Sequence, residues 1–136
     1  MLNIDAIDSR YGRIQALHGV SLQVKAGELV ALVGANGAGK STLLRAISGV
    51  QPLSGGSMLF DGQDLARLHP RQRVQAGIVQ VPEGRQVFGP MTVQDNLRLG
   101  AFARGKRDAL ARIYAMFPVL EEKAREEIAS RNRELG

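Results

Sequence analysis

Short apolar runs separated by glycine-rich turns occupy the first part of the chain. Apolar residues alternate with polar ones in 2–7 and in 16–24, which predicts two half-buried strands. The run 28–33 is apolar from its second residue onward, as is typical of a parallel strand buried on both faces. Residues 57–60 and 78–81 predict two further strands. The pattern predicts a small antiparallel sheet attached to a parallel core.

Helical spacing of apolar residues begins after the run 28–33. The segment 42–49 has its apolar residues at helical spacing, and Gly49 is a natural C-cap. A short helix is predicted at 71–76. Thr92, with an acidic residue three positions later, is expected to cap the start of another helix.

The last part of the chain also has helical periodicity, with a break at Pro118. Its apolar stripe, which we interpret as core packing, consists of Ile113, Phe117, Leu120, Ala124 and Ile128. Two pairs of opposite charge, Glu121/Arg125 and Lys123/Glu127, stand four residues apart, and we interpret them as a solvated face.

A glycine-rich loop joins the run 28–33 to the first predicted helix. Its sequence, Gly34-Ala35-Asn36-Gly37-Ala38-Gly39-Lys40-Ser41-Thr42, fits G-x-x-x-x-G-K-[ST], the phosphate-binding P-loop. Glycines allow successive N–H groups to point into one concavity at a helix N-terminus, where the helix dipole favours anions. The residues predicted to bind a nucleoside triphosphate are Gly34, Asn36, Gly37, Ala38, Gly39, Lys40, Ser41 and Thr42. Lys40 is directed at the β- and γ-phosphates, and the Ser41 hydroxyl is a predicted Mg²⁺ ligand.

The amino-acid composition limits the classes of site and of function that the chain could have. The chain has 136 residues, room for one domain, and contains no cysteine, which excludes disulfides and thiolate metal sites. We expect neither a signal peptide nor a membrane span. The net charge of +5 raises the possibility of nucleic-acid binding, but the basic residues are dispersed and lack interleaved aromatic residues. We interpret them as a solvated surface, and both histidines, His18 and His69, as structural.

The opening of the chain resembles an ATP-binding-cassette (ABC) ATPase subunit. The resemblance lies in Leu17-His18-Gly19-Val20-Ser21-Leu22, then Gly27-Glu28, then the P-loop. It implies an α/β fold, a P-loop NTPase core with an N-terminal antiparallel β subdomain and the start of a helical subdomain. It also implies that Tyr11 stacks on the adenine ring of ATP, the alternative being a packing residue at a strand end.

A second stretch makes the resemblance more specific. Pro82-Glu83-Gly84-Arg85 and then Val87-Phe88 resemble the smaller ATPase subunit of bacterial branched-chain amino acid importers, and a related urea importer subunit carries similar residues. Glu83 stands where the family usually has a glutamine that contacts Mg²⁺ and the attacking water. The resemblance therefore implies Lys40 and Glu83 as catalytic residues, with Ser41 and Glu83 as metal ligands.

The resemblance covers only the first half of the family's domain, so the fold is expected to be a truncated one. We expect residues 1–83 to form the β subdomain and P-loop core, and residues 84–136 to begin the helical subdomain. Residues 53–57 look like the family's signature sequence but lie too close to the P-loop, so we interpret them as a loop. No apolar run ending in Asp-Glu follows the P-loop, and hydrolysis by this chain alone is not expected. We expect an exposed apolar sheet edge or face and weak stability.

The resemblance also implies partners. These are a second ATPase subunit in a head-to-tail dimer and membrane permease subunits that contact residues around 84–105, at the cytoplasmic face of the membrane. The transported solute meets other subunits. Two other functions remain open: a nucleotide-binding module without turnover, and an ABC-type protein that acts on nucleic acid or ribosomes, for which the charge is the only indication.

Overall fold

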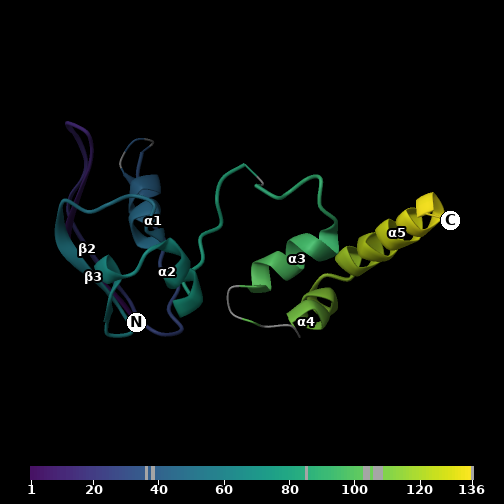
Figure 1. The fold of residues 1–136 in the computed structure, drawn as a ribbon. Helices are drawn as coiled ribbons and strands as arrows, with labels where there is room; N and C mark the ends of the chain where they lie inside the picture. The colour runs from purple at the N-terminus through teal and green to yellow at the C-terminus, as the bar shows by residue number, and fades with distance from the viewer. Residues whose placement is uncertain (36, 38, 85, 103–104, 106–108, 136) are drawn as a thin grey trace. The chain divides into compact units, whose positions relative to one another are not determined.

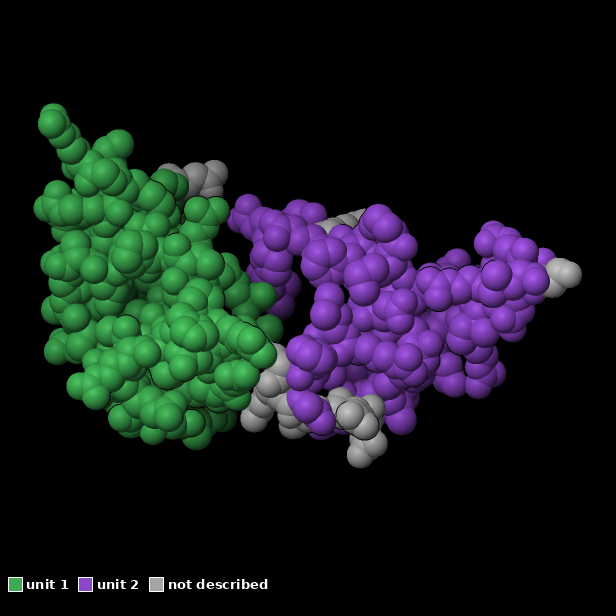
Figure 2. All heavy atoms as spheres, in the orientation of Figure 1, with its two compact units in different colours: residues 1–80 green, residues 81–136 purple. Residues whose placement is uncertain are grey.

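The computed structural model describes residues 1–35, 37, 39–84, 86–102, 105 and 109–135. The chain forms two compact units, residues 1–80 and residues 81–136, which Figure 2 distinguishes by colour. The sequence places the boundary after residue 83.

Unit 1 is built on a four-stranded antiparallel sheet in the order β2-β1-β3-β4. Figure 1 labels β2 and β3 of this sheet. Its strands are β1 (Leu2–Tyr11), β2 (Ile14–Val24), β3 (Gly55–Phe60) and β4 (Gln63–Asp64). The other elements are α1 (Lys40–Ser48), the 3₁₀ turn η1 (Leu65–Arg67) and α2 (Pro70–Ala76). The antiparallel sheet and both helices agree with the sequence pattern, and Gly49 caps α1 at a φ of 94° as predicted.

The core of unit 1 lies between the sheet and α1. Its buried apolar residues are Ile4, Ile7, Leu17, Leu43, Ala46, Met58 and Leu65. Leu43 and Ala46 belong to α1, so the helix that begins at the P-loop docks directly on the strands. Each large side chain buried here stabilises the unit by about 1.5–3 kcal/mol relative to an exposed one. The position of α1 is therefore fixed by packing.

Arg73 of α2 is a buried cation, 7% exposed. Its guanidinium donates to the carbonyl oxygens of Ala46 and Ile47 at 2.7 and 3.0 Å, and to those of Leu65 and Leu68 at 2.6 and 2.8 Å. Burial lowers the pKa of Arg73, an effect that nearby Asp64 opposes. These bonds satisfy carbonyls in the last turn of α1 and join it to η1 and α2.

The strands predicted at 28–33 and 78–81 are not formed, which corrects the expectation of a parallel core. Neither segment pairs with another strand within the described part of the chain. Leu29 and Val33 are 97% and 91% exposed, so apolar surface is exposed as expected, but on an unpaired segment and not on a sheet edge or face. The physical reason is that strand pairing requires a neighbour for every backbone N–H and C=O, and an apolar sequence cannot supply one by itself.

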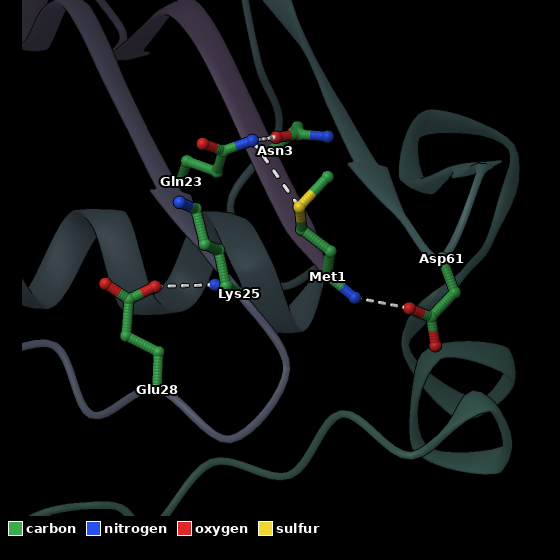
Figure 3. A network of polar contacts seen from close by, with 6 residues as sticks. All are labelled: Met1, Asn3, Gln23, Lys25, Glu28 and Asp61. Carbon is green, nitrogen blue, oxygen red and sulfur yellow. Dashed lines mark hydrogen bonds and ion pairs between the residues drawn. The ribbon is translucent and has the colours of Figure 1, made fainter.

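A turn after β2 leads into the segment 29–33. The backbone N–H of Lys25 donates to the Glu28 carboxylate at 2.7 Å, and the Glu28 N–H donates to the Lys25 carbonyl at 3.1 Å (Figure 3). Figure 3 also shows exposed polar contacts nearby, including Gln23 Nε2 to Asn3 Oδ1 at 2.8 Å. This turn is one of those expected between the apolar runs, and the Glu28 side chain stabilises it.

Unit 2 contains α3 (Val93–Phe102), α4 (Ala109–Met116) and α5 (Pro118–Leu135). Thr92 caps α3 as predicted, since its hydroxyl accepts from the Asp95 N–H at 3.1 Å. The break at Pro118 also agrees, because α5 begins at this residue. None of the helices in the described ranges is long and apolar enough to cross a membrane.

The charged residues of α5 form two exposed ion pairs. Arg125 bonds the Glu121 carboxylate at 2.8 Å, four residues away. Lys123 lies 3.6 Å from Glu126. The Glu127 carboxylate instead accepts from the Val93 N–H at 2.9 Å, at the N-terminus of α3. A free N–H at a helix N-terminus is a better partner for a carboxylate than an exposed lysine.

Candidate nucleotide-binding site

The P-loop of unit 1 has the backbone conformation that glycine permits. Gly37 and Gly39 have φ values of 85° and 95°. A Cβ atom on Gly39 would lie 2.8 Å from the carbonyl oxygen of Ala16 and 3.0 Å from Leu17 Cδ2. The loop therefore passes so close to β2 that a side chain does not fit at Gly39.

The loop leads into the N-terminus of α1, where the first backbone N–H groups have no partner within the helix. The Leu43 N–H makes the first bond of the helix, to the Gly39 carbonyl at 2.9 Å. The N–H groups of Lys40, Ser41 and Thr42 therefore have no intrahelical acceptor. No acidic residue occupies the first turn, so no carboxylate of α1 competes with an anion there.

Lys40 and Ser41 add side-chain chemistry to these donors. The Lys40 ammonium donates to the carbonyl oxygen of Gly34, which places a full positive charge against the loop. The Ser41 side chain is exposed. The structure thus brings Gly34, Gly37, Gly39, Lys40, Ser41 and Thr42 together, whereas Asn36 and Ala38 lie outside the described residues.

Tyr11 stands at the end of β1 and contacts α1 through its hydroxyl. The phenol oxygen lies 3.3 Å from Thr42 Oγ1. This hydrogen bond and the charge of Arg45 lower the pKa of Tyr11, against the opposing effect of desolvation. The side chain remains 42% exposed. The structure therefore places the predicted base-stacking residue next to the predicted phosphate-binding helix.

Arg45 was not predicted from the sequence as part of this site. It stands three residues after Thr42, which is helical spacing, so the two share a face of α1. That spacing is the signal that could have found it.

Glu83 lies in unit 2 and is exposed. Its approach to Ser41 stays a prediction. No cluster of three or more His, Asp or Glu residues suited to a metal ion occurs in the described ranges.

The residues present fit a nucleoside triphosphate. N–H groups without an intrahelical acceptor, an ammonium and a glycine-rich loop at a helix N-terminus are the features expected around a bound phosphate. The exposed Ser41 hydroxyl is a hard oxygen ligand suited to Mg²⁺, an ion that retains several waters and needs few protein groups.

Comparison with known proteins supports the same assignment. The family model described as ABC transporter matches residues 17–135. The high-affinity branched-chain amino acid transport ATP-binding protein BraG of Pseudomonas aeruginosa is 44% identical over 126 residues, 90% of this chain and 54% of that protein. The sulfate/thiosulfate import ATP-binding protein CysA of Bacillus cereus is 41% identical over 105 residues, 77% of this chain and 29% of that protein.

The fold is also that of a solved ABC subunit. A structure of an ATP-binding subunit of an ABC transporter superposes with a TM-score of 0.79 at 30% identity, covering 91% of this chain and 52% of the other. The chain thus spans about half the length of BraG and of this solved subunit. The phosphate loop, the antiparallel sheet and these matches together show that the chain belongs to the ABC transporter family, as an ATP-binding subunit.

Proposed function

We propose that this chain binds ATP with Mg²⁺ and belongs to an importer in which ATP binding and hydrolysis drive transport of branched-chain amino acids. The observation that carries ATP binding is the N-terminus of α1, where three N–H groups lack an intrahelical acceptor and the Lys40 ammonium bonds the Gly34 carbonyl of the loop. The amino acid specificity is supported by the likeness to BraG and by the stretch 82–88.

Each residue of the site has a proposed role. The backbone from Gly34 to Thr42 holds the phosphates, and Lys40 neutralises charge on the β- and γ-phosphates. Tyr11 stacks on the base. Ser41 and Glu83 hold Mg²⁺, which supplies charge neutralisation at the phosphates when it is bound, and Glu83 positions the attacking water.

A second candidate function is nucleotide binding without turnover. Phosphoryl transfer needs metal ligands, water positioning and charge stabilisation at once. The sequence has no apolar run ending in Asp-Glu after the P-loop. Segments 29–33 and 78–81 also lack strand partners within the described residues. We therefore expect this chain alone to bind ATP and to release little phosphate.

The proposed partners are a second ATPase subunit, arranged head to tail, and permease subunits at the cytoplasmic face of a membrane. Unit 2 has a hollow of about 490 Å³ beside α3 and α4. It is lined by Leu97, Arg98, Ala101, Phe102, Gly105, Ala109, Leu110 and Ile113. The hollow overlaps the segment 84–105 expected to face the permease.

The identity of the transported solute is the most specific element of the proposed function. A sulfate importer subunit is nearly as similar as BraG, over a shorter stretch, so overall identity does not separate solutes. A urea or amide importer is the alternative, because its subunit shares residues of the type found at 82–88.

The test measures ATP affinity by calorimetry in Mg²⁺ buffer, together with phosphate release. K40A is expected to weaken ATP binding at least tenfold, since a full charge beside the phosphates is lost. K25A is the matched control, because the Lys25 side chain is exposed and only its backbone holds the turn. Equal ATP affinity of K40A and the unaltered chain would contradict the proposal. Rapid phosphate release by the unaltered chain would contradict the second candidate.

A further inference from the structure

Tyr11 belongs to an exposed hairpin tip. The residue pairs with Ile14 at the last rung between β1 and β2, and the side chains from Arg10 to Ile14 are all exposed. Strand pairing therefore fixes the backbone of Tyr11 but leaves its ring without a close-packed pocket. The ring needs a tether to keep one position.

Thr42 is suited to be that tether. It is 8% exposed and lies beside Leu43 and Ala46, which pack on the sheet. Its hydroxyl lies 3.3 Å from the Tyr11 phenol oxygen, and Arg45 of the same helix also acts on this phenol. A rigid residue of α1 thus holds a residue of an otherwise exposed tip.

We infer that Thr42 is a positioning residue for Tyr11, and that their hydrogen bond couples the base-binding and phosphate-binding parts of the nucleotide site. The inference rests on the proposed function, because it assumes a base beside Tyr11 and phosphates beside α1. It adds a specific link between the two parts.

The link joins two hydroxyls, and either of them can donate. When Tyr11 donates to Thr42, the Thr42 proton stays available for a phosphate oxygen. A chain of two donors then runs from Tyr11 through Thr42 to the phosphates, and each bond strengthens the other.

The experiment compares two ligands on the same protein. Dissociation constants for ATP and for inorganic tripolyphosphate, which has no base, are measured by calorimetry in Mg²⁺ buffer. Their ratio reports the contribution of the base, and damage to the P-loop affects both ligands and cancels. Y11F removes the hydroxyl and keeps the ring, so we expect the ratio to fall about two- to tenfold, the equivalent of one neutral hydrogen bond.

Variants of Thr42 identify the partner. T42V removes the hydroxyl and keeps the branched shape, and it should lower the ratio as Y11F does. T42S restores the hydroxyl and should restore the ratio. In the double variant Y11F/T42V the ratio should fall no further than in either single variant, because both changes delete the same bond. Y114F removes the other tyrosine hydroxyl of the chain, in α4, and serves as the matched control.

The outcomes separate the two proposals. An unchanged ratio in Y11F, or effects of Y11F and T42V that add, overturns the coupling. Equal affinity of the unaltered chain for ATP and tripolyphosphate also overturns it, while leaving phosphate binding intact. Failure of the unaltered chain to bind either ligand overturns the proposed function itself. Y11F alone carries the test if T42V does not fold, because Tyr11 is partly exposed.

Discussion

The guanidinium of Arg73 donates to the Ala46 carbonyl at 2.7 Å, at the opposite end of α1 from the P-loop. The N-terminus of α1 has no acidic residue in its first turn and can hold an anion. The carbonyls at its C-terminus are bonded by the buried Arg73. Both arrangements complement the helix dipole, positive at the N-terminus and negative at the C-terminus. The proposed ATP site depends on this second contact, because α1 must stay docked to present its N–H groups.

R73M should therefore destabilise unit 1 strongly. It removes the donors to four carbonyls, and leaving buried acceptors unpaired costs about 1–3 kcal/mol each before relaxation. We expect a loss of about 3 kcal/mol or more in the free energy of unfolding, measured with urea. R71M, on the exposed face of α2, should change it by less than about 0.5 kcal/mol. Equal stability of the two variants would show that Arg73 is not needed to hold α1.

G39A should weaken ATP binding and lower stability together. Its Cβ would meet the Ala16 carbonyl at 2.8 Å, so the loop must move away from β2. We expect a rise of about tenfold or more in the dissociation constant for ATP, and a loss of about 1–3 kcal/mol of stability from the strained backbone. G27A is the matched control, since Gly27 has a φ of 74° but a Cβ atom added to it would meet no atom within 4 Å. A larger effect on ATP affinity in G27A than in G39A would refute the close approach.

The phenol of Tyr11 should ionise below the ordinary pKa of tyrosine. Thr42 and Arg45 both lower its pKa, because a hydrogen bond and a positive charge favour the phenolate. The chain has two tyrosines and no tryptophan, so in Y114F the absorbance of the phenolate reports Tyr11 alone. T42V should move the midpoint upward. No upward movement would show that the hydrogen bond is absent in solution.

The lowered pKa of Tyr11 also determines how its ionisation changes the free energy of unfolding with pH. A depressed pKa in the folded state stabilises the protein fully only above the pKa of the unfolded tyrosine, and the effect disappears as the pH falls through the pKa of folded Tyr11. Tyr11 ionisation should therefore leave stability unchanged near neutral pH and contribute only in alkaline solution. A change in the Y11F stability difference between pH 6 and pH 8 would contradict this assignment.

The segment 29–33 should behave as exposed surface. Leu29 and Val33 are almost fully exposed, so L29N/V33N is expected to change the free energy of unfolding by less than about 0.5 kcal/mol. It should also lower the binding of a hydrophobic dye and the tendency to aggregate. L43A is the contrasting variant, since Leu43 is buried and its truncation should cost about 2–5 kcal/mol. A cost in L29N/V33N similar to that in L43A would show that the segment is buried in solution.

Local sequence signals predicted much of this protein. Gly49 ends α1, Thr92 caps α3 and Pro118 begins α5, each through chemistry confined to a few neighbouring residues. The P-loop was equally recognisable, because its glycines and Lys40 act on the backbone next to them. The antiparallel sheet followed from the alternation of residues in β1 and β2.

Other contacts depend on partners distant in the sequence. Tyr11 meets Thr42 and Arg73 meets Ala46 only because the sheet and helices pack together, and neither pairing leaves a local pattern. Glu127 likewise bonds Val93 in α3 in place of its helical neighbour, Lys123.

The sequence by itself determined the phosphate loop, the helix ends and the family, since these depend on residue types at fixed short spacings. Only the tertiary structure decided whether an apolar run became a strand. The runs 28–33 and 78–81 carry strand-like sequences, yet they stay unpaired within the described part of the chain. The physical reason is that a strand is completed by hydrogen bonds to another strand, whereas a helix satisfies its backbone, except at its ends, within its own residues.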